Sequence, residues 1–159
     1  MNKLQNIALR EYMPDDYKQV ESVNSKTLRV SFSYLYNMYH KKHPDLFLVV
    51  QDKEEKKIIG FILVDIEGGE IKENSALIYA IGVLEEYRRL GIGKMLIEKI
   101  LENLKNYPQV EQLYLHVQDS NKNAYKFYLA LGFKFVKTLD NFYSWGEKAH
   151  QMNLKLKNE

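Results

Sequence analysis

The middle of the chain constrains the fold more than any other segment. An apolar run, Ala76–Leu84, is followed by a charged loop with glycines and then by apolar residues at helical spacing over 92–105. Pro108 ends this helix, and a second apolar strand is expected over 112–118. Two strands joined through a helix run parallel in one sheet. The segment therefore predicts a parallel pair of strands within an α/β fold.

Strand and helix patterns also alternate through the rest of the chain. Strands are expected over 7–12, 46–50, 58–64, 133–136 and 150–156, and helices over 17–24, 32–40 and 124–131. Pro14 favours the start of the first helix, Pro44 ends the second, and Gly132 is expected to cap the last. Gly68-Gly69 marks a hairpin turn. This order predicts a mixed, mostly antiparallel sheet of about seven strands, flanked by about four helices.

The composition fits a single globular domain over residues 1–159, with 45% hydrophobic and 28% charged residues. A net charge of +2 is too balanced to indicate nucleic acid as the main partner. The chain has no cysteine, and His40, His43 and His150 lack ligand spacing, so no disulfide and no metal site is expected. Neither a signal peptide nor a membrane-spanning run is evident, which predicts a cytoplasmic protein without a membrane partner.

The loop before the central helix has the chemistry of an anion site. Residues 88–94 read Arg-Arg-Leu-Gly-Ile-Gly-Lys. A helix N-terminus offers unpaired N–H groups and a partial positive charge, and glycines at 91 and 93 keep side chains away from them. Arg88, Arg89 and Lys94 add positive charge. These features predict a pyrophosphate as the ligand.

Two nucleotide-binding motifs do not fit this loop. A Walker loop requires Gly-Lys-Ser/Thr, whereas Met95 follows Gly93-Lys94, and a dinucleotide fingerprint requires three glycines rather than two. An alternative interpretation is that the glycines only form a tight helix start and that the arginines are solvated. The loop alone leaves this alternative open.

Two segments carry a resemblance to a known family. Residues 88–93 resemble the Arg/Gln-x-x-Gly-x-Gly/Ala pyrophosphate loop of the GNAT acetyltransferases, and residues 121–133 are similar to that family's Asn-x-x-Ala-x-x-x-Tyr-x-x-x-Gly-Phe segment. The resemblance covers nearly the whole chain and is weakest over 24–44. It implies a GNAT fold whose sheet splays at the central parallel pair, with acetyl-CoA as cosubstrate.

The resemblance also implies which residues hold the coenzyme. The pantetheine arm would pair with the backbone of Ile81 and Val83, after a bulge near Val83, and would contact Asn121. Tyr128 would point its hydroxyl at the coenzyme sulfur. The expected coenzyme-binding residues are Ile81, Val83, Arg88, Arg89, Gly91, Ile92, Gly93, Lys94, Asn121 and Tyr128.

The expected reaction is attack of a neutral amine on a thioester, which releases a thiolate. Tyr128 is the candidate general acid, because a phenol can protonate a thiolate; alternatively it is a buried tyrosine of a helix face. His116 is the candidate base, acting directly or through water, although a single histidine in a strand is usually structural. Tyr79 is the second candidate, for organising that water.

Within the family, the closest resemblance is to the protein N-terminal acetyltransferases of the San type, which use a histidine at the position of His116. The acceptor is expected to bind between a wall formed by Leu28, Val30 and Phe32 and a loop containing Phe142 and Tyr143. This chain departs from the pattern at four positions: Arg29 in the first-residue wall, Leu77 at the place of an assisting tyrosine, Phe142 in a tyrosine pair, and Lys148 for a common aspartate.

The absence of a carboxylate in strand 76–84 favours an acceptor amine of low pKa, such as an α-amine near ~8 rather than a lysine amine near ~10.4. We therefore expect acetyl transfer to the N-terminal α-amine of a protein or peptide, by direct attack in a ternary complex. The alternatives are a GNAT enzyme acting on a small amine, such as a polyamine, amino acid or aminoglycoside, and a non-catalytic CoA-binding regulatory module. A monomer or a homodimer is expected.

Overall fold

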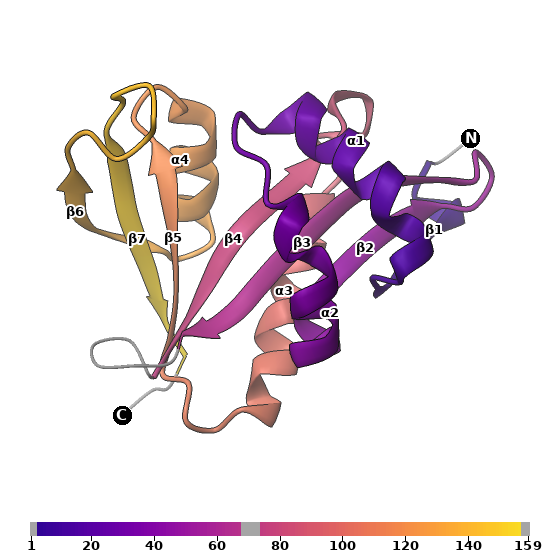
Figure 1. The fold of residues 1–159 in the computed structure, drawn as a ribbon, viewed down its shortest axis with the longest axis horizontal. Coiled ribbons are helices and arrows are strands. Elements are labelled where there is room, and N and C mark those ends of the chain that lie inside the picture. Colours follow the sequence, from indigo (N-terminus) through magenta and orange to yellow (C-terminus); the bar gives the residue numbers. More distant parts are fainter. Residues whose placement is uncertain (1–2, 68–73, 157–159) are drawn as a thin grey trace. The chain divides into compact units, whose positions relative to one another are not determined.

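The computed structural model describes residues 3–67 and 74–156 (Figure 1). The strands are β1 Ile7–Glu11, β2 Phe47–Asp52, β3 Lys57–Glu67, β4 Ser75–Val83, β5 Gln112–Gln118, β6 Lys134–Leu139 and β7 Ala149–Lys155. The α-helices are α1 Tyr17–Thr27, α2 Tyr36–Lys42, α3 Ile92–Asn103 and α4 Lys122–Ala130. The hydrogen-bonded order of the seven-stranded sheet is β1-β2-β3-β4-β5-β7-β6. The predicted order of elements is confirmed.

The parallel pair predicted from the middle of the chain is β4 with β5. Its residue pairs are Ser75 with Gln112, Ala76 with Leu113 and Leu77 with Tyr114. β5 also pairs antiparallel with β7 along its whole length. The sheet is therefore mixed, as expected, and β4 is an internal strand.

Some element boundaries differ from the sequence-based expectation. The helix expected over 32–40 begins as a 3-10 turn, Ser33–Leu35, and only then continues as α2. The last strands were expected over 133–136 and 150–156, but β6 extends to Leu139. Backbone hydrogen bonds to β7 continue β6 through polar residues whose pattern does not indicate a strand. The hairpin at Gly68-Gly69 lies outside the described residues.

The contacts divide the chain into two compact units. The first consists of residues 1–65 and 79–107, and the second of residues 66–78 and 108–159. β4 therefore contributes residues 75–78 to the second unit and its remaining residues to the first. The expectation of one domain over the whole chain stays a prediction.

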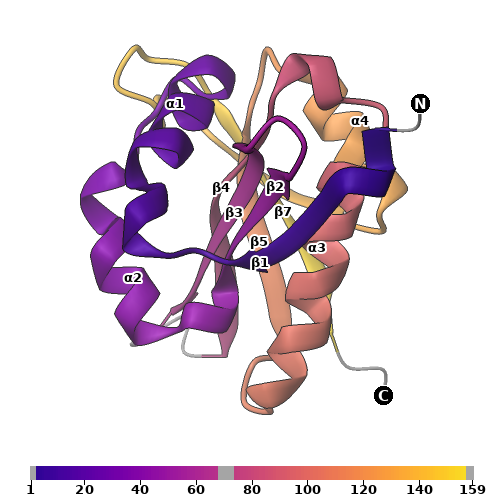
Figure 2. The same ribbon diagram turned by 90° about the vertical axis from the view of Figure 1, so that its right-hand side faces the viewer.

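In the first unit, α1 and α2 cover one face of β2, β3 and β4, and α3 covers the other (Figure 2). Between the first pair of helices and the strands lies an aromatic core, in which the Tyr12 and Phe47 rings stack at 4.1 Å. Tyr36 and Phe61 complete this cluster, and all four side chains are fully buried. Burial of an apolar ring such as that of Phe47 or Phe61 stabilises the fold by roughly 1.5–3 kcal/mol. This core fixes the position of the two helices on the strands.

The second unit contains β5, β6, β7 and α4. Phe133 lies three residues after the end of α4, is buried, and contacts the Tyr128 ring at a centroid distance of 5.6 Å. Gly132 has a φ of +99°, which confirms it as the left-handed cap after α4. The cap turns the chain sharply so that β6 pairs with β7.

None of the helices in residues 3–67 and 74–156 has the length and apolar character needed to cross a bilayer.

Candidate active site

The predicted pyrophosphate loop connects β4 to α3 in the first unit. Arg89 and Gly91 both have left-handed backbones, with φ of +64° and +83°. Successive turns of this kind aim backbone N–H groups into one concavity. Gly91 is the N-cap residue of α3, and no side chain among the described residues caps this helix. The first N–H groups of α3 therefore remain available to an anion.

The open space and the positive charge around this loop both suit a pyrophosphate. A Cβ atom on Gly91 would meet no atom within 4 Å, so the space above the loop is open. Arg88, Arg89 and Lys94 are exposed. The structure thus brings together the residues that the sequence assigned to pyrophosphate binding.

The base of the loop is anchored by contacts that the sequence analysis missed. The Tyr87 hydroxyl donates to Oδ2 of Asp52 at 2.5 Å, and both residues are buried. Burial is the main cause that raises the pKa of Tyr87, and the Asp52 carboxylate adds to it. Oδ1 of Asp52 accepts the N–H groups of Glu54 and Glu55 in the turn between β2 and β3. Asp52 thereby ties this turn to the residue that precedes Arg88.

The backbone predicted to receive the pantetheine arm is half-buried at Ile81 and Val83. Nε of Arg88 donates to the Val83 carbonyl at 3.0 Å, so this acceptor already has one partner. The bulges recorded for the described pairings lie elsewhere, between Val50 and Gln51 in β2 and between Phe135 and Lys137 in β6. The bulge near Val83 stays a prediction.

The first unit also holds Tyr79 and the expected acceptor wall. The Tyr79 ring contacts the rings of Phe32 and Tyr39, at centroid distances of 5.6 and 5.4 Å. The structure therefore brings Tyr79 and Phe32 together. Leu28 and Val30 are half-buried, and Asn24 donates to the Val30 carbonyl at 2.9 Å, which fixes this segment after α1.

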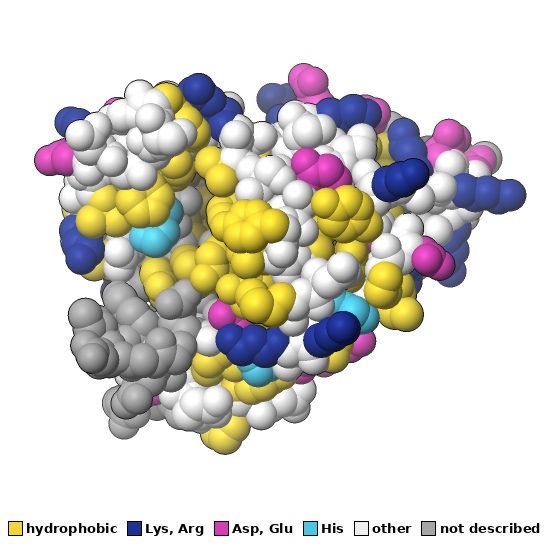
Figure 3. All heavy atoms as spheres, viewed as in Figure 1, with side chains coloured by type: hydrophobic (Ala, Val, Ile, Leu, Met, Phe, Trp, Pro, Cys, Tyr) yellow, Lys and Arg dark blue, Asp and Glu magenta, His cyan; other side chains and the backbone are white. Residues whose placement is uncertain are grey.

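Hydrophobic side chains are exposed on the face of this unit that carries α1 and α2 (Figure 3). The exposed large residues of these two helices and of the segments that lead into them are Met13, Tyr17, Tyr34 and Met38.

In the second unit, His116 lies on β5 between two aromatic rings. The Phe142 ring is 4.7 Å from the imidazole, and the Tyr114 ring is 5.8 Å from it, nearly perpendicular at 88°. Phe142 comes from the loop between β6 and β7, which the sequence assigned to the acceptor. The structure thus places the candidate base in contact with that loop.

Tyr128 lies on α4 and is only 7% exposed. Burial raises the pKa of its phenol, and the neighbouring Tyr143 raises it further. The hydroxyl makes no hydrogen bond within the described residues. Tyr128 is therefore held in its protonated form with a donor that remains available to a ligand.

Asn121 has a structural role that the sequence analysis did not assign. Its Oδ1 accepts the N–H of Ala124 at 3.1 Å, which makes Asn121 the N-cap of α4. Its amide nitrogen makes no hydrogen bond within the described residues. A donor consequently remains for the predicted contact with pantetheine.

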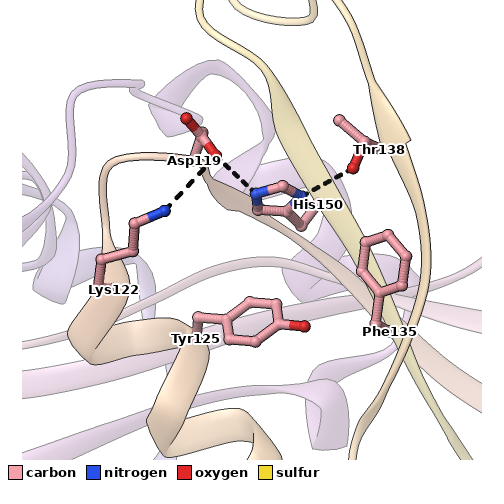
Figure 4. A pocket seen from close by; sticks show the side chains of 6 residues that line it. All are labelled: Asp119, Lys122, Tyr125, Phe135, Thr138 and His150. Atoms are coloured by element: carbon pink, nitrogen blue, oxygen red, sulfur yellow. Dashed lines mark hydrogen bonds and ion pairs between the residues drawn. The ribbon is translucent and has the colours of Figure 1, made fainter.

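A cavity of about 340 Å³ lies beside α4 in the second unit (Figure 4). It is lined by Asp119, Lys122, Tyr125, Phe135, Thr138 and His150. Nε2 of His150 lies 2.8 Å from Oδ1 of Asp119, and its Nδ1 lies 3.0 Å from the Thr138 hydroxyl. The neutral tautomer with its proton on Nε2 satisfies both hydrogen bonds. The sequence gives no signal for this role of His150, because Asp119 and Thr138 lie in separate segments of the chain.

Within residues 3–67 and 74–156, no group of three or more histidine and carboxylate side chains is arranged to hold a metal ion. The expectation of a metal-free site stays a prediction.

Comparison with known proteins agrees with the motifs. Residues 3–133 match the model of the Acetyltransferase (GNAT) family. The N-alpha-acetyltransferase of Saccharolobus solfataricus is 35% identical over 160 residues, which cover 95% of this chain and 94% of that protein. The probable N-acetyltransferase San of Drosophila melanogaster is 27% identical over 144 residues, covering 91% of this chain and 77% of that protein.

Solved structures show the same fold. The crystal structure of Ard1 from Thermoplasma volcanium superposes with a TM-score of 0.82 at 25% identity, covering 96% of this chain and 99% of that one. Naa50 of Arabidopsis thaliana, in complex with the bisubstrate analogue CoA-Ac-MVNAL, has a TM-score of 0.80 at 23% identity, with coverage of 94% and 98%.

Proposed function

Because this chain belongs to the GNAT acetyltransferase family and is an acyltransferase that uses acetyl-CoA, we propose that it acetylates the N-terminal α-amine of a protein or peptide. The observation that carries the proposal is the contact between His116 and Phe142, which joins the candidate base to the candidate acceptor loop. The similarity to an N-alpha-acetyltransferase along nearly the whole chain supports it.

In this proposal the coenzyme is held by the residues that the family motifs name. Its pyrophosphate lies on the N–H groups of the 88–94 loop, with Arg88, Arg89 and Lys94 balancing its charge. The pantetheine arm bonds to the backbone of Ile81 and Val83 and to the amide nitrogen of Asn121. The unpaired helix start and the available Asn121 donor support these assignments.

The chemical step follows from the polarity of the two reactants. In a ternary complex the neutral α-amine attacks the thioester carbon, a C–N bond forms and the C–S bond breaks. His116 accepts the proton that the amine loses, directly or through a water molecule that Tyr79 organises. Tyr128, as the general acid, donates the proton of its hydroxyl to the departing sulfur. Burial raises the pKa of Tyr128, so the phenol is protonated at neutral pH and the donor is present when the thiolate develops.

The proposed acceptor is an extended peptide. Leu28, Val30 and Phe32 are assigned to its first residue, and Phe142 and Tyr143 are assigned as further acceptor contacts. An α-amine with pKa near ~8 is partly neutral at pH 7, so a histidine suffices as its base. Monomer or homodimer formation and a cytoplasmic location remain predictions from the sequence.

The experiment that tests the proposal is incubation with acetyl-CoA and a library of short peptides that differ in their first residue, analysed by mass spectrometry. We expect a mass gain of one acetyl group on the peptide N-terminus, for a subset of first residues. Turnover of spermidine or of a free amino acid, with no acetylated peptide, would instead support the small-amine alternative. Coenzyme binding without turnover of any amine would support the non-catalytic alternative.

A further inference from the structure

Glu147 connects two parts of the second unit that have separate roles in the proposed function. Its Oε1 accepts the indole N–H of Trp145 at 2.9 Å, and its Oε2 accepts the backbone N–H of Ser120 at 2.7 Å. Its backbone carbonyl accepts the N–H groups of Phe142 and Tyr143, both at 3.1 Å. One residue thereby holds the acceptor loop and also the turn between β5 and α4.

The acceptor loop is ordered around Glu147. The Tyr143 and Trp145 rings stack at 4.8 Å with an interplanar angle of 11°. Because the indole N–H is fixed by Glu147, this stack also fixes the Tyr143 ring. Phe142 contacts Tyr143 at 5.0 Å on one side and His116 at 4.7 Å on the other. The Glu147 carboxylate therefore determines where the loop presents its aromatic side chains to the acceptor.

Through its second carboxylate oxygen, Oε2, Glu147 holds the turn that carries Asn121. Ser120 immediately precedes Asn121, the N-cap of α4 and the predicted pantetheine contact. A second link lies one residue earlier, where His150 bonds the Asp119 carboxylate (Figure 4) and the Asp119 N–H donates to the Lys148 carbonyl at 3.0 Å. The hydrogen bond from His150 is the largest cause that lowers the pKa of Asp119, followed by the charge of Lys122. Residues 147–150, which lead into β7 and begin it, thus hold two adjacent residues of this turn, Asp119 and Ser120.

We propose that Glu147 is a positioning residue that couples the acceptor loop to the coenzyme-binding turn. The acceptor binds best when Glu147 holds the loop at Trp145, and the coenzyme binds best when Glu147 holds the turn at Ser120. The inference rests on the proposed function, because it assigns the loop to the acceptor and Asn121 to the coenzyme. Glu147 itself touches neither reacting group in this account. Its two carboxylate oxygens act on different elements, which makes the two effects separable by mutation.

The test compares two variants with the parent enzyme. Glu147→Gln keeps the side-chain shape but removes the charge and one acceptor oxygen. One of the two N–H groups then faces an amide NH2 group, and the other keeps only a weaker bond to a neutral oxygen, so both contacts are weakened. Losing a hydrogen bond to a charged group corresponds to about a tenfold change in binding. We expect the Kd of acetyl-CoA, measured by calorimetry, and the KM of an acceptor peptide both to rise, each by up to about tenfold. We expect kcat to stay within about twofold, because His116 and Tyr128 are unchanged.

Trp145→Phe removes the indole N–H but keeps a ring to stack on Tyr143, and it leaves the Ser120 bond to Glu147 intact. We expect this variant to raise the acceptor KM and to leave the Kd of acetyl-CoA unchanged. The matched control is Glu102→Gln, an exposed residue of α3 whose recorded ion pair is with Lys99. It should change neither constant.

Two results would overturn the coupling role. One is an unchanged Kd of acetyl-CoA in Glu147→Gln. The other is a loss of active protein, seen as a lower kcat and melting temperature with both binding constants preserved, which would make Glu147 merely structural. If the parent acetylates no peptide, the proposed function fails, and the calorimetric comparison still decides whether Glu147 acts on the coenzyme.

Discussion

The ring of Phe142 lies 4.7 Å from the ring of His116, with the two planes inclined by 33°. Tyr114 contacts the same imidazole through a nearly perpendicular ring. Contacts with these two rings restrict the orientations of the imidazole, and a catalytic base must be oriented toward the proton that it accepts. A small misplacement of a catalytic group lowers rates strongly.

The first prediction concerns this contact. Phe142→Ala should lower kcat/KM for a peptide acceptor by roughly tenfold, because the imidazole loses one of the rings that orient it. Phe142→Tyr, which restores the tyrosine pair of the San-type enzymes, should keep the parent value within about twofold. Steady-state kinetics at fixed saturating acetyl-CoA measures both. Equal losses in the two variants would show that the ring contact does not orient His116.

The second prediction concerns the proton donor. Tyr128→Phe should lower kcat by roughly 10²–10⁴-fold, the usual contribution of general acid catalysis. The Kd of acetyl-CoA should change little, because the phenyl ring still packs against Phe133. Rapid-quench measurement of the chemical step, together with calorimetry, separates the two effects. An unchanged chemical step would leave Tyr128 as a structural residue.

The third prediction concerns pH. Burial raises the pKa of Tyr128 above its ordinary value, so the phenol is protonated throughout the neutral and mildly alkaline range. Loss of this proton should therefore reduce kcat/KM only above about pH 10. The pH profiles of the parent and of Tyr128→Phe are the measurement. An alkaline limb below pH 10 that disappears in Tyr128→Phe would contradict the assignment.

The fourth prediction concerns the coenzyme loop. Gly91→Glu should weaken acetyl-CoA binding by at least about a hundredfold, because it adds negative charge at the helix start and strains a left-handed backbone. Gly91→Asn is the matched control, since asparagine tolerates this backbone and adds no charge. Gly91→Asn should bind acetyl-CoA distinctly more tightly than Gly91→Glu. Parent-like affinity in Gly91→Glu would refute the site assignment.

The fifth prediction concerns the anchor of that loop. The hydrogen bond from Tyr87, followed by the Glu55 and Glu54 N–H groups, lowers the pKa of Asp52. A lowered carboxylate pKa contributes stability above the unfolded value near ~4, and this contribution is lost as pH falls through the folded pKa. Asp52→Ala should therefore unfold at lower urea than the parent at pH 7. The difference should shrink below about pH 4; a constant difference would contradict this account.

Much of the fold could be predicted because its signals are local. The apolar spacing of α3, the glycines of the loop before it, and the Gly132 cap each lie within a few residues of one another. The strand–helix–strand order then required the parallel pair of β4 and β5. The boundaries of β6 were less predictable, since pairing with β7 overrides its polar sequence.

Site residues could be proposed from the sequence where a family motif contains them, and not where contacts join distant segments. The roles of the 88–94 loop and of Tyr128, which the resemblance implies, stay predictions. The bond between Asp52 and Tyr87, and the contacts of Glu147, involve ordinary polar residues whose partners lie elsewhere in the chain. From the sequence, Asn121 was assigned only to the coenzyme. Its spacing to Ala124 matches a family motif, and the same spacing also lets its side chain cap the helix, a role that was not expected.

The central claim is that the acceptor is an N-terminal α-amine. Two peptides of one sequence test it most directly, one with a free N-terminus and blocked lysines, the other with a blocked N-terminus and free lysines. Initial rates of acetyl transfer at pH 7 are compared for the parent, His116→Ala and Tyr143→Ala. We expect the parent to prefer the peptide with the free N-terminus clearly, and this preference to be diminished in both variants. Equal rates on the two peptides, or a preference for the lysine peptide, would contradict it.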